Sequence, residues 1–300
     1  MYELSILNPS AASLTDPPVW IDPRFMQAVR DLHQIDASLL LCHKGEQLVA
    51  ALPLYEKKRL GLRRLICPMS SYYQGLWFFW EPEREPNRNL LDELKISSEV
   101  ARFLKARYQR MQFNLAPHNA DVRGFTWQGL KALPYYTFTH DCARELRILK
   151  DERKKLRMAR DRDYRLVEEF RPEEFIILLK DLYDRKEKSL GVSYKAFRNW
   201  MENLHQDGLI AQFNLMEKDK IVSANLVLGG NHDKRGYSIM RSTLPRDLKA
   251  GASALHSLLL VELVKPRFES LDFCGANYPE VARFKAALGF KLELFFKIRG

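Results

Sequence analysis

The chain has 300 residues, of which 46% are hydrophobic and 29% charged, and its formal net charge is +10. This composition excludes a disordered protein, a collagen-like fibre and a coiled-coil rod, and the length allows one large domain or two medium ones. Apolar runs such as Leu76–Trp80 are too short to span a bilayer, and residues 1–5 lack the basic start of a signal peptide. We therefore expect a soluble, cytoplasmic protein without a transmembrane segment.

The excess of positive charge is concentrated in one segment. Residues 1–143 carry a net charge of +2 and residues 144–300 a net charge of +8, of which +5 lies between Arg144 and Arg165. A concentrated basic segment favours a phosphate-bearing partner, although a solvated helix face would have the same composition. The four cysteines and seven histidines show no metal-ligand or disulfide spacing, so we predict no bound metal.

In chain order, the first half opens with a helix over residues 22–36, with Asp22 as N-cap and Pro23 in the first turn. A β-hairpin over residues 39–54 and a long helix over residues 89–110 follow. In the second half we expect a basic helix over residues 145–162 and amphipathic helices over residues 172–190 and 194–204. A hairpin over residues 213–228 and a strand over residues 236–243 follow. A helix of small and apolar residues over 251–265 and closing strands over 271–274 and 292–298 complete the chain.

The sequence repeats itself at long range. The hairpin over residues 39–54 has the same pattern as residues 213–228, and residues 113–125 match residues 273–285 at an offset of 160. Gly129 and Gly289 correspond at the same offset. We therefore expect two copies of one α+β unit, each a central mixed sheet flanked by helices, over residues 1–143 and 144–300.

One segment has the chemistry of a phosphate-binding turn. After a strand and Pro245, the small residues from Lys249 to Ser253 open a helix, whose unpaired backbone N–H groups would face a pyrophosphate. Arg246 and Lys249 add positive charge beside it. The alternative is an ordinary helix start packed closely against a sheet. P-loop, Rossmann, nucleophile-elbow and zincin motifs are absent from the sequence.

The order of elements around this turn resembles a GNAT acyltransferase domain. The ending Asp272-Phe-Cys-Gly275 and Phe284-Lys-Ala-Ala-Leu-Gly-Phe290 resembles the Fem-like branch of that superfamily, which includes peptidoglycan bridge aminoacyltransferases, and the basic segment Leu149–Ala159 and the turn Pro68–Leu76 are also similar to it. The resemblance covers nearly the whole chain and implies a tandem GNAT fold. On the GNAT signature [QR]-x-x-G-x-[GA], the chain reads Arg246-Asp-Leu-Lys-Ala-Gly251, with Lys249 in place of the first glycine.

The resemblance implies a role for each of a small set of residues. Acyl-CoA would be bound by Arg246, Leu248, Lys249, Ala250, Gly251, Ala252 and Ser253. Lys285 would stabilise the oxyanion that forms when an amine attacks the acyl carbonyl, and Asp272 would orient Lys285 or the amine. Substrate contacts are expected from Tyr73, Tyr237 and Asn277. For each residue the alternative is structural: a surface lysine, a turn-capping aspartate or a core aromatic.

The expected activity is N-acyl transfer from acyl-CoA to an amine, on an amine-bearing small molecule or a cell-envelope precursor. The first copy lacks an equivalent of Lys249–Ser253 and would serve the acceptor. An aminoacyl-tRNA donor is the first alternative, but acidic residues interrupt the basic segment, which favours a solvated helix over a nucleic-acid groove. A non-catalytic ligand-binding module is the second alternative.

Overall fold

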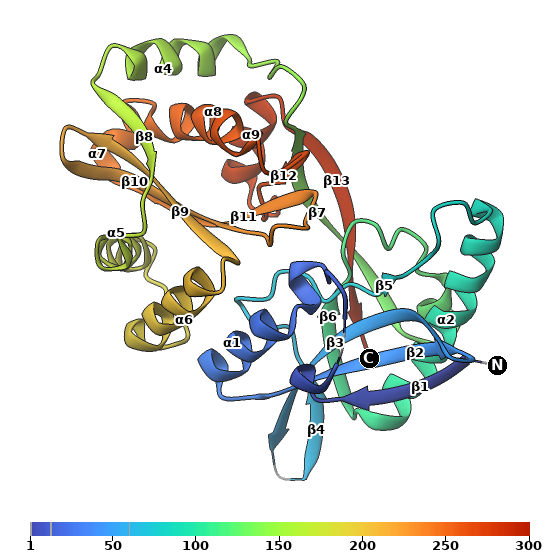
Figure 1. Ribbon diagram of the computed structural model, residues 1–300. Helices are drawn as coiled ribbons and strands as arrows, with labels where there is room; N and C mark the ends of the chain where they lie inside the picture. Colours follow the sequence, from blue (N-terminus) through green and yellow to red (C-terminus); the bar gives the residue numbers. More distant parts are fainter. Residues whose placement is uncertain (1, 13, 60) are drawn as a thin grey trace. The chain divides into compact units, whose positions relative to one another are not determined.

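The computed structural model describes residues 2–12, 14–59 and 61–300, and the chain forms two compact units. The first unit comprises Met1–Tyr135 and Leu294–Gly300, and the second comprises Tyr136–Glu293 (Figure 1). No helix in the described ranges is long and apolar enough to cross a bilayer.

The first unit contains a sheet with the strand order β1-β2-β3-β4-β6-β13, and β5 pairs with β3. Neighbouring strands are antiparallel except β4 and β6, which are parallel. The core of this unit includes Leu52, Val100 and Phe113, all almost fully buried. Its elements are β1 (Tyr2–Leu7), α1 (Pro23–His33), β2 (Asp36–Lys44), β3 (Gln47–Arg59), β4 (Leu62–Leu65), β5 (Trp77–Phe78), α2 (Pro86–Arg107), β6 (Arg110–Asn114), α3 (Arg123–Thr126) and most of β13 (Lys291–Arg299), with short 3-10 turns at Pro9–Ala11 and Val19–Ile21.

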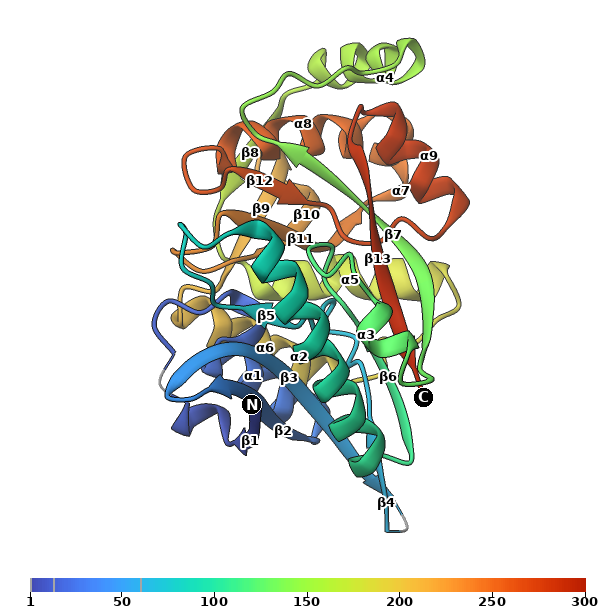
Figure 2. The same cartoon turned by 90° about the vertical axis from the view of Figure 1, so that its right-hand side faces the viewer.

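The second unit contains a sheet with the strand order β8-β9-β10-β11-β12-β7. Again one neighbouring pair, β11 and β12, is parallel and the others are antiparallel. Helix α4 lies over α8, on the side of α8 away from the sheet (Figures 1 and 2). The elements are β7 (Lys131–Asp141), α4 (Lys150–Arg160), β8 (Tyr164–Glu168), α5 (Pro172–Arg185), α6 (Tyr194–Gln206), β9 (Ile210–Glu217), β10 (Lys220–Leu228), β11 (Arg235–Thr243), α7 (Pro245–Lys249), α8 (Ala252–Val264), β12 (Ser270–Asp272) and α9 (Pro279–Ala287).

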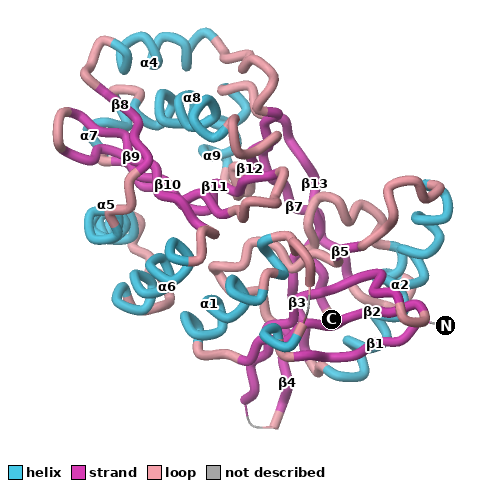
Figure 3. The backbone as a smooth tube through the Cα atoms, in the orientation of Figure 1, coloured by secondary structure: helices cyan, strands magenta, loops and turns pink. Residues whose placement is uncertain are grey.

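The predicted repeat is confirmed, because the two sheets have the same order of parallel and antiparallel neighbours. The segments that match at an offset of 160 are β6 with α3 and β12 with α9, and Gly129 and Gly289 both adopt positive φ, +80° and +87°. The predicted mixed sheets with flanking helices are also present (Figure 3).

The compact units differ from the expected ranges 1–143 and 144–300 because the last strands of the two copies are exchanged. β7 follows α3 in the first copy but pairs with β12 through Ser270↔Asp141 to Asp272↔Thr139. β13 follows α9 in the second copy but pairs with β6 through Lys297↔Asn114 to Arg299↔Gln112. Each unit is therefore completed by the terminal strand of the other copy.

Local signals place most helices within a few residues. The Asp22 side chain accepts a hydrogen bond from the Arg24 N–H at 2.8 Å, as expected of an N-cap. The basic helix was predicted from residue 145, but α4 begins at Lys150, because Leu149 is extended and donates its N–H to the Ala287 carbonyl at 2.9 Å. The sequence analysis predicts no strand at β1, β4, β5, β7 or β8. Of these, β4, β5 and β8 are short, with four, two and five residues, whereas β7 has eleven.

Candidate active site

The parallel strands β11 and β12 pair over only three residues and then separate. The pairs are Arg235↔Ser270, Gly236↔Leu271 and Tyr237↔Asp272, where β12 ends. β11 continues to Thr243, paired with β10 alone, and its register shifts where Leu226 faces Met240 and Val227 faces Ser238. Within the described chain, no backbone hydrogen bond from Ser238 to Thr243 reaches the β12 side. The edge of β11 beyond Tyr237 can therefore accept an extended, amide-bearing chain.

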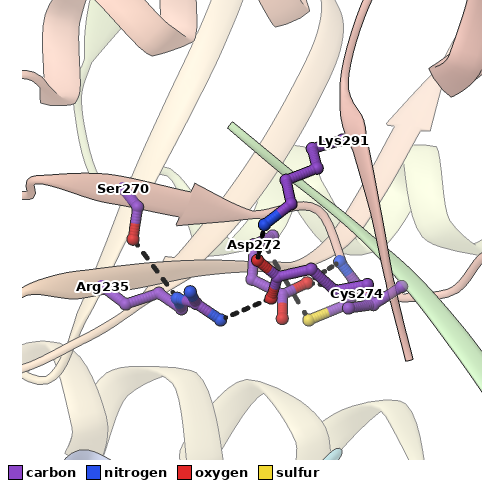
Figure 4. Close-up of polar contacts among 7 residues, drawn as sticks. Arg235, Ser270, Asp272, Cys274 and Lys291 are labelled. Carbon is purple, nitrogen blue, oxygen red and sulfur yellow. Dashed lines mark hydrogen bonds and ion pairs between the residues drawn. The ribbon is translucent and has the colours of Figure 1, made fainter. Parts of the chain in front are cut away.

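Asp272 closes β12 at the point where the two strands part. Its side chain is fully buried, and Oδ1 accepts hydrogen bonds from Thr137 Oγ1 at 2.5 Å and from the Cys274 N–H at 2.8 Å. Figure 4 shows Asp272 beside Cys274 and Arg235. Arg235 donates to Ser270 Oγ at 3.2 Å and pairs with Glu293 at 3.1 Å. Asp272 thus joins β7 to the turn that follows β12.

Lys285 reaches the same turn from α9. Its Nζ donates to the carbonyl oxygens of Phe273 and Gly275, each at 2.6 Å, and to that of Cys274. Cys274 and Gly275 both adopt left-handed φ values, 38° and 75°, so the turn is backbone-strained at the cysteine. Lys285 is buried, and burial lowers its pKa to about 8. All three ammonium N–H groups are used, so in this geometry none remains for a substrate oxyanion.

The structure therefore brings Asp272 and Lys285 together around Cys274, one on its N–H and the other on its carbonyl. The Cys274 thiol is buried, and burial raises its pKa well above the usual range, which is unsuited to a nucleophile. The two predicted catalytic residues therefore fix the backbone of the turn over residues 273–275, next to the point where β11 and β12 separate.

The predicted pyrophosphate turn is covered by α4. Gly251 has φ 84° and is the N-cap of α8, and a Cβ atom built on it would lie 2.4 Å from the Lys155 carbonyl oxygen. Gly251 and Ala252 are buried, and Ala250 and Ser253 are half-buried, with Ser253 Oγ 3.0 Å from Thr243 Oγ1. The alternative of a closely packed helix start thus describes this turn as it stands.

The charged residues expected beside this turn have other partners or face solvent. Arg246 pairs with Asp247 at 3.0 Å and with Glu217 at 3.6 Å. Lys249 and Leu248 are exposed. A cavity of about 290 Å³ borders Gly251 and Ser253, and its charged lining residues are Glu152, Glu280 and Lys155, which pairs with Glu152. The net charge of these three side chains is negative, which disfavours an anion at this helix start in the observed arrangement.

The three expected substrate contacts have different surroundings. Tyr73 is fully buried in the first unit, with edge-to-face contacts to Trp20, Tyr72 and Phe295. Tyr237 is almost fully buried in β11. Asn277 is exposed, and its side-chain amide exchanges two hydrogen bonds of 3.1 Å with the backbone of Tyr136. Tyr73 and Asn277 therefore have evident structural roles, and Tyr237 lies where β11 and β12 separate.

Sequence reasoning missed a buried polar cluster that links β11 to α8. Arg241 donates from Nη1 to Ser257 Oγ at 2.5 Å and to the Ser253 carbonyl at 3.2 Å, and from Nε to Asn225 Oδ1 at 3.1 Å. Its Nη2 is buried without a hydrogen-bond partner, and no carboxylate of the described chain pairs with it. Burial lowers the pKa of Arg241 to about 10. An uncompensated guanidinium at the open part of β11 is suited to a negatively charged or carbonyl oxygen.

His256 lies in the same cluster. It is fully buried on α8, its Nδ1 is 2.9 Å from Ser223 Oγ, and its Nε2 has no partner. Burial, and then the charge of Arg241, lower its pKa well below the ordinary value, so the imidazole is neutral. The signal in the sequence was one histidine within a helix of small and apolar residues, Gly251–Lys265, and one arginine in a strand. No group of three or more metal-ligating side chains is found in residues 2–12, 14–59 and 61–300.

Comparison with solved structures identifies the fold. FemX superposes with a TM-score of 0.63 over 91% of this chain and 90% of its own, at 13% identity. A tandem GNAT protein from the clavulanic acid biosynthesis pathway superposes with a TM-score of 0.50 over 100% and 98%, at 14% identity. The chain has the tandem GNAT fold.

A third GNAT-fold neighbour is the C-terminal domain of a putative lysylphosphatidylglycerol synthetase from Agrobacterium fabrum, with a TM-score of 0.55 over 92% and 89% and 12% identity. No protein-family model and no curated protein matches the sequence. At these identities the comparisons show the fold and leave the chemistry to the residues of the site.

Proposed function

We propose that this GNAT-fold protein is an N-acyltransferase that moves an acyl group from acyl-CoA to an amine. The observation that carries the proposal is the separation of β11 from β12 beyond Tyr237 and Asp272. The pantetheine arm of CoA is an extended chain with two amides, and amides pair with an unpaired strand edge in the way an added β-strand does. A thioester at the end of such an arm would lie beside the turn that Asp272 and Lys285 hold.

In the proposed reaction, the neutral amine attacks the thioester carbonyl, the C–N bond forms, and the tetrahedral oxyanion collapses with loss of the CoA thiolate. The amine proton passes to the leaving sulfur, so the products are an amide and free CoA thiol. Arg241 has an unpartnered buried N–H group and is the better candidate for the oxyanion than Lys285, whose three donors are taken. Lys285 and Asp272 act as positioning residues.

The acceptor in this proposal is an amine-bearing small molecule or a cell-envelope precursor, and the first copy contributes to its binding. The lysylphosphatidylglycerol synthetase neighbour suggests testing amino acids as well as amino sugars. The experiment incubates purified protein with acetyl-CoA or a longer acyl-CoA and a panel of amines, and measures free thiol. Amine-dependent thiol release is expected, and it should fall in Arg241→Met.

One observation favours a second donor, aminoacyl-tRNA. The covered start of α8 leaves no room for a pyrophosphate against Gly251 unless α4 moves. Transfer from labelled aminoacyl-tRNA to the same amines, without thiol release from any acyl-CoA, would replace the first proposal by this one. Binding of an amine with neither donor used would indicate a non-catalytic module.

A further inference from the structure

The basic residues around α4 fall into two sets in the structure. Two of those outside the groove pair with carboxylates, Lys155 with Glu152 at 2.6 Å and Arg162 with Glu217 at 2.6 Å, whereas Lys154 is exposed. A second set lines one groove, and none of its members has an ion-pair partner among the described residues: Arg147, Lys150, Arg153, Arg157 and Arg160. Most of the basic side chains of this segment that have no ion pair among the described residues therefore line the groove.

The groove set forms a stripe. Lys150, Arg153, Arg157 and Arg160 follow one another at spacings of three, four and three residues, so on a helix they lie within about 80° of the circumference. From Lys150 to Arg160 the stripe is about 15 Å long at the rise of an α-helix. All four side chains are exposed. A single phosphate cannot contact a stripe of this length, so its match is a polyanion or an array of anionic groups.

The floor of the groove is aliphatic. The groove has a volume of about 1020 Å³, and its remaining lining residues are Leu146, Ile148, Leu149, Leu156 and Leu258. None of its lining residues is acidic or aromatic. Of these, Leu149 is 60% exposed, and Met158 of α4, outside the groove lining, is 48% exposed.

This combination separates two kinds of polyanion. Proteins that hold single-stranded nucleic acid use aromatic side chains on which bases stack, and none lines this groove. Exposed leucine and methionine beside lysine and arginine are typical of segments that lie at a lipid–water interface. The anionic headgroups of a bilayer supply an array of charges, and its acyl region accepts the aliphatic side chains.

We propose that this groove docks the protein on an anionic phospholipid surface, with headgroup phosphates on the five cations and Leu149 at the acyl boundary. The proposal goes beyond acyl transfer, because it assigns a membrane partner to a face remote in sequence from the β11 edge. It holds whichever acyl donor the protein uses.

Vesicle co-sedimentation tests this assignment without any activity measurement. The full chain is mixed with vesicles of phosphatidylcholine alone or of equal parts phosphatidylcholine and phosphatidylglycerol. Binding is expected only to the anionic vesicles and should weaken with salt. In Arg153→Gln/Arg157→Gln the partition coefficient should fall about 30-fold, at about fivefold for each cation removed. The matched control Lys186→Gln/Lys195→Gln removes two exposed charges outside α4 and the groove lining and should bind nearly as the wild type does.

Two further arms distinguish the alternatives. Leu149→Ser should weaken vesicle binding while retaining all five cations, and soluble glycerol phosphate should fail to compete, because it offers neither an array nor an apolar phase. Equal loss in the groove and control variants would overturn the proposal. Binding of total tRNA that depends on Arg153 and Arg157, with no binding to anionic vesicles, would overturn it in favour of a nucleic-acid surface.

Discussion

Gly251 at the start of α8 lies directly under the carbonyl oxygen of Lys155 in α4, at a distance where a Cβ atom would be 2.4 Å from that oxygen. The same glycine has φ 84°, so both the left-handed backbone and the close contact with Lys155 require a residue without a Cβ atom. The turn expected to hold a pyrophosphate is therefore also the contact that seats the basic helix on the second unit.

Gly251→Ala should reduce the free energy of unfolding more than a left-handed backbone alone explains. Gly208→Ala is the matched control, because Gly208 has φ 70° and open space around its Cα. We expect a loss of about 1–2 kcal/mol for the control and about 1–3 kcal/mol more for Gly251→Ala, from backbone overpacking. Urea denaturation measures both. Equal losses would mean that α4 does not rest on Gly251.

Lys285→Met should destabilise the protein, because it leaves three buried carbonyl oxygens without a donor. We expect a loss of about 3–5 kcal/mol, from about 1–3 kcal/mol for each unsatisfied group with partial relaxation. Lys291→Met is the control, since Lys291 is exposed and its pairing with Glu293 is 3.5 Å long. If Lys285→Met kept wild-type stability but lost turnover, the lysine would be a direct oxyanion donor instead of a positioning residue.

Arg241→Met should separate stability from activity. Arg241→Met removes three hydrogen bonds, but the Asn225 amide oxygen and the Ser253 carbonyl keep Ser238 and Ser257 as donors, so we expect the free energy of unfolding to fall by only about 1–2 kcal/mol. Turnover in the proposed reaction should fall about 10²-fold. Arg235→Met, on the same strand, breaks a pair with Glu293 and should cost about 1–3 kcal/mol. A large stability loss in Arg241→Met with normal turnover would assign Arg241 to the structure alone.

His256 predicts a pH dependence of stability. Its pKa is lowered well below 6.5 in the folded chain, by burial and by Arg241, whereas the unfolded chain has the ordinary value. Below pH 6.5 the unfolded state therefore binds a proton that the folded state does not, and the free energy of unfolding decreases as the pH is lowered. The loss from this residue grows as the pH is lowered from 6.5.

Comparing His256→Gln with the wild type in urea at about pH 5 and pH 7 isolates this contribution. His33 and His140 also have lowered pKa values from burial and keep their share of the dependence in both proteins. The variant should lose less stability on acidification than the wild type. An identical loss in both would mean that His256 is protonated in the folded state.

The sequence by itself determined the repeated unit and much of its local structure. Alternating apolar residues around Lys44-Gly45 and Lys218-Asp219 specify hairpins, and the match at an offset of 160 specifies strand, turn and helix, because these patterns arise from backbone geometry over a few residues. The same local pattern pointed to Asp272 and Lys285, which do meet at one turn.

Only the tertiary structure decided which partners these elements take. The alternation in β7 and β13 fits either sheet, so the exchange of the two strands depends on long-range pairing that no local pattern encodes. The helical period fixes the spacing of Lys150, Arg153, Arg157 and Arg160, but the packing of Leu156 and Ala159 on α8 chooses the side that stays open. Likewise, the hydrogen bonds of Lys285 and Arg241 join residues 10 or more positions apart in the sequence. Which acceptors they reach, and that Arg241 Nη2 reaches none, depends on how the side chains are buried in the fold.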